Sequence, residues 1–125
     1  MCLLMACFGE VEARERARHA PPEAVICERN QLTSYHGELS AYRAEQAGIH
    51  FEIATEWGTV ENLVIPVNDP ARPDTAFLLE GAPFGSSDWD AIASEPGSRT
   101  PRPGIGLIAW VCLDDETATM IDWRP

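Results

Sequence analysis

The chain has 125 residues, of which 45% are hydrophobic and 23% charged, and this composition is typical of one globular domain. Twenty acidic residues and nine basic ones give a net charge of −11. This charge disfavours direct binding to nucleic acid or to an anionic membrane, because phosphates are repelled. No apolar run approaches the roughly 20 residues that span a bilayer.

The N-terminal stretch supports two interpretations. Residues 2–19 fit one amphipathic helix with Leu4, Cys7, Phe8 and Val11 on its apolar stripe. The alternative is a buried strand at 2–8 followed by a helix at 10–19, and in both cases the prolines at 21–22 end the helix. The stretch lacks the basic leader of a secretory signal, so we expect a cytoplasmic protein.

The next segments predict a connector and a long helix. Residues 24–27 form a small apolar patch, which fits either a short strand or a packed connector. Apolar and long side chains then recur at steps of three and four, which predicts a helix from Asn30 to Gly48 with one packed face. The residues on that face are Leu32, Tyr35, Leu39, Tyr42 and Gln46.

From Ile49 onward the pattern changes to alternation, which is typical of β-strands. Residues 49–54 and 60–67 predict a hairpin that turns at 57–59, and Pro66 predicts that its second strand is an edge strand. Residues 76–80 predict another strand, and a short helix is expected to begin at residues 86–87, where Ser86 or Ser87 would cap it.

The last part of the chain predicts a second hairpin. Residues 105–113 are apolar on both faces, which indicates a central strand covered above and below, and an acidic turn joins them to a strand at 117–123. Together, the elements predict a single α+β domain over 1–125. We expect N-terminal helices packed on a mostly antiparallel four- or five-stranded sheet with a C-terminal β-hairpin.

The four cysteines Cys2, Cys7, Cys27 and Cys112 show no paired C-x-x-C spacing. We interpret them as free thiols in the core of an intracellular protein. A disulfide between two of them is the alternative.

Most of the negative charge lies in the middle of the chain. Residues 44–98 carry ten acidic residues and one arginine, a net charge of −9. We expect these carboxylates to form a common negative surface that attracts a basic protein. The alternative is an acidic face that serves solubility alone. The predicted partner-binding residues are Glu52, Glu56, Trp57, Glu61, Asp88, Trp89 and Asp90. Core packing is the alternative role for each tryptophan.

The sequence carries no phosphate-binding loop, no G-x-S-x-G motif and no metal-ligand spacing, so we predict no cofactor, no metal site and no catalytic residue. The leading hypothesis is a small non-enzymatic inhibitor of a basic, nucleic-acid-acting protein such as a nuclease, of the toxin-immunity or phage anti-defence (anti-CRISPR-like) type. The second hypothesis is a small enzyme or ligand-binding domain with a pocket between helices and sheet, using Cys2 as an N-terminal nucleophile or His50. A third is a subunit of a larger assembly.

Overall fold

The computed structural model describes residues 20–67, 69 and 72–125. The helix predicted over 2–19, the alternative strand and helix there, and the cysteines Cys2 and Cys7 lie outside these residues. The strands are β1 (Leu32–Glu45), β2 (Gly48–Thr55), β3 (Val60–Ile65), β4 (Phe77–Leu79), β5 (Ala82–Pro83), β6 (Gly106–Cys112) and β7 (Met120–Trp123). The helical elements are η1 (Arg29–Gln31), η2 (Pro73–Ala76), η3 (Ser86–Asp88), α2 (Trp89–Ile92) and η4 (Glu116–Ala118).

All seven strands belong to one mixed sheet in the order β3-β2-β1-β6-β7-β4-β5. Neighbouring strands are antiparallel except for β4 and β7, which are parallel. The predicted α+β fold is therefore wrong. The described chain is mainly β, and its one α-helix is a short segment in which η3 runs directly into α2. None of the described helices is long and apolar enough to cross a membrane.

The largest error concerns the helix predicted from Asn30 to Gly48, where the structure has β1. The core face of β1 carries Tyr35, Gly37 and Leu39, and after a bulge between Leu39 and Ala41 it continues with Tyr42. The glycine leaves one core position without a side chain, and the bulge adds one residue to the next step. The large side chains are therefore spaced by four and then three, which imitates the period of a helix.

Gly37 occupies a position that no larger residue fits. It pairs with Thr55 of β2 on one side and with Leu107 of β6 on the other. A Cβ atom built on Gly37 would lie 2.1 Å from the backbone oxygen of Ala54, which is far inside van der Waals contact. The close approach of β2 at this point allows the long strand β1 to serve two neighbours, β6 along its first half and β2 along its second.

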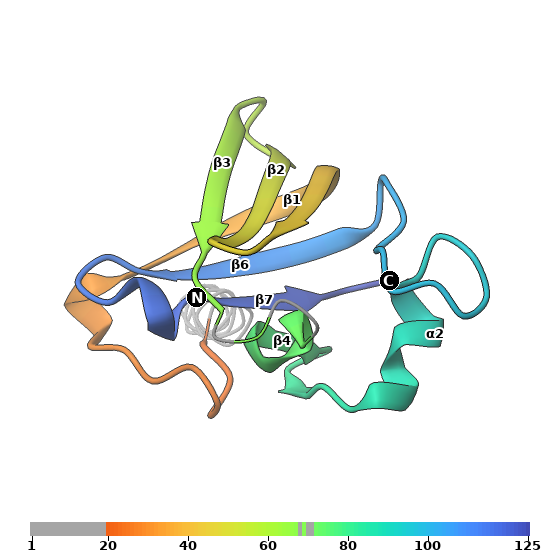
Figure 1. The fold of residues 1–125 in the computed structure, drawn as a ribbon. Coiled ribbons are helices and arrows are strands. Elements are labelled where there is room, and N and C mark those ends of the chain that lie inside the picture. Colours follow the sequence, from red (N-terminus) through yellow and green to blue (C-terminus); the bar gives the residue numbers. More distant parts are fainter. Residues whose placement is uncertain (1–19, 68, 70–71) are drawn as a thin grey trace, which may run out of the picture.

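The sheet bends between the strands β3-β2-β1 and the strands β6-β7-β4 (Figure 1). The core lies on the inner side of this bend, where the two groups of strands face each other. Phe51 of β2 has its ring centroid 6.2 Å from that of Trp123 of β7 and 6.3 Å from that of Phe77 of β4. Phe77 also packs edge-on against Phe84 and Trp89, at 5.5 and 5.6 Å, so the α2 segment closes one end of the core.

Several strand predictions are confirmed. The hairpin predicted at 49–54 and 60–67 is β2–β3, and β3 lies at the edge of the sheet. The strands predicted at 76–80 and at the C-terminus are β4 and the antiparallel pair β6–β7. β6 is the middle strand of seven, with Leu107 and Ala109 buried on the core face and Trp110 buried on the other.

Two local predictions need correction or refinement. The short helix exists, but its first turn is capped by Asp88, whose Oδ2 accepts the Gly85 N–H at 2.8 Å, and not by Ser86 or Ser87. The apolar patch at residues 24–27 is a connector and forms no strand.

The connector is joined covalently to the centre of the sheet. Cys27 and Cys112 form a disulfide with a Cα–Cα distance of 5.9 Å, and they are separated by 85 positions in sequence. The prediction of free thiols is wrong for these two cysteines. Disulfides are rare in a reducing cytosol, so this bond is unexpected for a cytoplasmic protein.

Candidate functional site

The most exposed aromatic side chain in the described chain lies at the tip of the β2–β3 hairpin. Trp57 is 84% exposed. Hydrogen bonds between Thr55 and Thr59 hold this turn. The Thr55 N–H donates to the Thr59 backbone oxygen at 2.9 Å, and the two threonine hydroxyls lie 2.6 Å apart. Gly58 provides the left-handed backbone conformation with φ 83°. A rigid turn therefore presents an indole to solvent.

The strand register decides which predicted acidic residues share a face with one another. Glu52 pairs with Asn62 across β2 and β3, whereas Glu61 pairs with Ile53, which is a core residue. Paired residues point to the same face of a sheet and successive residues alternate. Glu52 therefore lies on the outer face of the sheet and Glu61 on the opposite face, so the two do not share one face.

A residue that sequence reasoning missed adds to the outer face. Glu38 pairs with Ala54, and Ala54 pairs with Val60, which places the three side chains in one row on the outer face. Nothing in the sequence singles out Glu38, because the side chains around it recur with the period of a helix. Val60 and Val64, also on this face, are 57% and 49% exposed. Exposed valines on a strand give no sequence signal that separates them from core valines.

The carboxylates of this region differ in whether they are paired. Glu45 forms an ion pair with Arg43 and contacts His50 Nε2 at 3.3 Å. By contrast, no described side chain forms a hydrogen bond or an ion pair with Glu38, Glu52, Glu56 or Glu61. We call Glu38, Glu52, Glu56, Trp57, Val60 and Val64 the hairpin surface; it combines unpaired carboxylates with exposed apolar side chains.

The other predicted site residues lie elsewhere. Asp88, Trp89 and Asp90 belong to the helical segment, which lies well away from the tip of β2–β3 (Figure 1). Trp89 is only 3% exposed and packs in the core, so it is not available as an anchor for a partner. The common negative surface expected over residues 44–98 is thus divided into separate groups.

One acidic residue of the middle segment is buried and has a structural role. Asp74 is 5% exposed and accepts a hydrogen bond from Trp89 Nε1 at 3.1 Å. Arg72 and Arg99 lie 3.3 and 3.8 Å from its carboxylate. Burial, with a smaller effect from the charge of Asp74, raises the pKa of Tyr42 to about 12. Asp74 therefore fixes the α2 segment and is not part of a negative surface.

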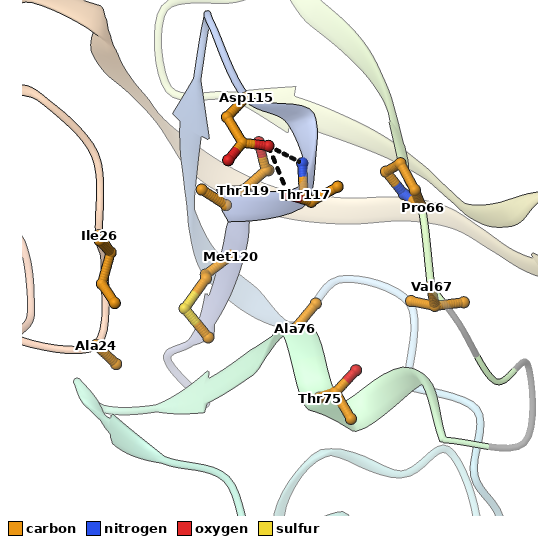
Figure 2. Close-up of a pocket in the computed structure, with 11 residues that line it drawn as sticks. Ala24, Ile26, Pro66, Val67, Thr75, Ala76, Asp115, Thr117, Thr119 and Met120 are labelled. Atoms are coloured by element: carbon orange, nitrogen blue, oxygen red, sulfur yellow. Dashed lines mark hydrogen bonds between the residues drawn. The ribbon is translucent and has the colours of Figure 1, made fainter.

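The groove between the connector and the sheet offers no catalytic group among the residues that line it (Figure 2). Its volume is about 410 Å³, and Ala24 and Ile26 lie on one side, Pro66 and Val67 on the other, with Met120 between them. Its one charged residue, Asp115, already accepts bonds from the Thr117 N–H and hydroxyl. Apart from Asp115 and three threonines, the residues that line the groove are apolar.

The second hypothesis named Cys2 and His50. Cys2 lies outside the described residues, and His50 contacts Arg43 and Glu45 on the sheet surface. Cys27, Cys112 and Asp114 come close enough to hold a metal ion, but the two sulfur atoms are bonded to each other.

Comparison with protein-family models, curated proteins and solved structures finds no match to this chain.

Proposed function

We propose that this protein is a non-enzymatic binding protein whose hairpin surface docks on a basic region of another protein. The observation that carries the proposal is the 84% exposure of Trp57 on a rigid turn beside unpaired carboxylates. Leaving an indole in water forgoes roughly 3 kcal/mol of favourable burial. Tryptophan is also among the residues that most often dominate the binding energy of protein interfaces.

The charge of the hairpin surface supports a basic partner. No lysine or arginine occurs between residues 44 and 71, whereas this stretch contains Glu45, Glu52, Glu56, Glu61 and Asp69. Glu38 and Glu52 on the outer face and Glu56 at the tip have no cationic neighbour that pairs with them in the described chain. Arginine or lysine side chains of a partner would supply the missing charges and form charge-assisted hydrogen bonds.

Within this proposal, inhibition of a nucleic-acid-acting protein remains the favoured role. A surface that binds phosphates is basic, and the unpaired carboxylates of the hairpin would occupy its arginine and lysine sites. The toxin-immunity or anti-defence class is the natural setting for such an inhibitor. The carboxylates near α2 lie away from the tip of the hairpin (Figure 1), so the proposal is based on the hairpin surface alone.

A comparative capture experiment tests the proposal. The wild-type protein, Trp57→Ala, and the triple variant Glu38→Gln/Glu52→Gln/Glu56→Gln are immobilised and exposed to extract of the source cell. The matched control is Asp90→Asn/Glu95→Gln, which removes two charges from another part of the surface. We expect a basic protein that is captured by the wild type and the control, lost with both hairpin variants, and released as salt rises. Equal capture by all four proteins would contradict the proposal.

A further inference from the structure

Among the described residues, the hairpin surface borders an edge of the sheet that no other strand covers. β3 is the first strand in the order of the sheet, and β2 is its one neighbour among the described strands. The alternation of hydrogen bonding in an antiparallel pair identifies which backbone groups of β3 remain open. The Thr55 N–H donates to the Thr59 oxygen, so 55–59 is a hydrogen-bonded pair. Counting along the register, residues 61, 63 and 65 bond to β2.

The intervening residues Val60, Asn62 and Val64 therefore direct their N–H and C=O groups away from β2. The same three residues carry their side chains on the outer face, and all three are exposed. The open edge thus presents three backbone donors and three acceptors, together with two exposed valines.

Edge strands are usually protected against pairing with other chains by lysine, proline, bulges or short length. β3 has six residues, and Pro66 follows only after its last residue. Its one charged side chain is Glu61, which disfavours pairing with an acidic strand and favours a basic one. The bulge of this sheet lies in β1 and not at this edge. β3 therefore retains the features of a strand that accepts another one.

An open edge can pair with a second copy of this chain or with a strand of another protein, and the charge of the hairpin distinguishes between the two. Pairing of β3 with a second copy of this chain would bring two sets of Glu52, Glu56 and Glu61 together, without a lysine or arginine on either hairpin. Like charges placed opposite one another destabilise strand pairing. A basic strand meets the same carboxylates with opposite charge.

We propose that the partner adds an extended, positively charged segment to the β3 edge as an eighth strand. This inference rests on the proposed function and specifies how the partner binds. Main-chain hydrogen bonds to Val60, Asn62 and Val64 provide affinity, and side chains at alternate positions provide specificity. The occupant is a segment that alternates arginine or lysine with aliphatic residues.

The outer face offers a place for one of the partner's side chains. A hollow of about 360 Å³ lies over β1, β2 and β3, lined in part by Ala41, Glu52, Asn62 and Val64. An arginine opposite Asn62 in an added strand would cross this hollow, and its guanidinium would reach the unpaired carboxylate of Glu52. Arg43 also lines the hollow, but Glu45 neutralises it.

A single substitution in β3 tests whether the partner adds a strand at this edge. The N–H of Asn62 points to the open edge, so Asn62→Pro removes a donor for the added strand without removing a bond to β2. Asn62→Ala keeps that N–H and serves as the control. The probe is a ten-residue peptide of alternating arginine and valine, with an alternating glutamate and valine peptide as its comparison. Binding and amide hydrogen exchange are followed by NMR.

We expect the arginine peptide to bind the wild type and Asn62→Ala, and to slow exchange of the Val60, Asn62 and Val64 amides about tenfold or more. Asn62→Pro should weaken binding about tenfold, and the glutamate peptide should not bind.

No binding of the arginine peptide at about 1 mM, binding without protection of these amides, or equal affinity for Asn62→Pro would overturn the inference. So would a concentration-dependent dimer that protects them without peptide. If the captured partner still requires Trp57, the edge-strand inference fails alone and the proposed function stands.

Discussion

Reduction of the Cys27–Cys112 disulfide should destabilise the fold by an amount that the chain-entropy model gives directly. The bond closes a loop of 85 residues between the connector and the central strand β6. For a loop of that length, the lost entropy of the unfolded chain corresponds to about 4.6 kcal/mol at 25 °C. A small domain is stable by only about 5–15 kcal/mol in total, so this single bond is a large part of the stability.

The structure gives a second reason for a large effect. Within residues 20–28, the described backbone hydrogen bonds are local, such as the one from Val25 N–H to the Pro22 oxygen. The disulfide is therefore the strongest attachment of this connector to the sheet. Its loss would release Ala24 and Ile26 from the groove that they border (Figure 2).

The assay is equilibrium unfolding in urea, monitored by tryptophan fluorescence, with and without a thiol reductant. Because the same side chains are present in both samples, no cavity or new polar group complicates the comparison. We expect the reduced protein to unfold at a urea concentration lower by on the order of 2 M. The variant Cys27→Ala/Cys112→Ala should be insensitive to reductant. Identical midpoints in both conditions would show that the disulfide does not stabilise the fold.

Three further predictions concern the backbone and a buried phenol. Gly37→Ala should destabilise the protein by about 1–3 kcal/mol or prevent folding, because the new Cβ would meet the Ala54 oxygen; thermal unfolding measures this. Glu80→Gly should stabilise by up to about 1 kcal/mol, because Glu80 adopts φ 49° in the β4–β5 turn; an unchanged or lower melting temperature would argue against strain there. The pKa of Tyr42 is raised from 10.0 to about 12, so the folded state favours the neutral phenol, and the stability present below pH 10 is lost as the pH rises toward 12. Tyr42→Phe should lose less stability than the wild type between pH 9 and 11, and equal losses would count against this cause.

The hairpins and the short helix could be predicted from sequence because their signals are local. Alternation from Ile49 and the proline after β3 identified the β2–β3 hairpin and its edge position. β1 could not be predicted in the same way, because Gly37 and the bulge after Leu39 convert its alternation into an apparent helical period. The disulfide joins positions 85 residues apart, and no local pattern indicates such a pair.

The candidate site shows the same division. Sequence reasoning named Glu52, Glu56 and Trp57 as candidates, but it could not assign Glu61 to the opposite face, because a shift of one residue in strand register reverses every side chain. It also could not distinguish the exposed Trp57 from the buried Trp89, since both stand beside acidic residues and only the tertiary fold separates them.

Amide hydrogen exchange of this protein, free and bound to the protein that it captures, tests the central claim most directly. We expect slower exchange in β2 and β3, strongest at the amides that face the open edge, and unchanged exchange in α2. Protection confined to α2 or to the connector at residues 20–28, with β3 exchanging as in the free protein, would contradict it.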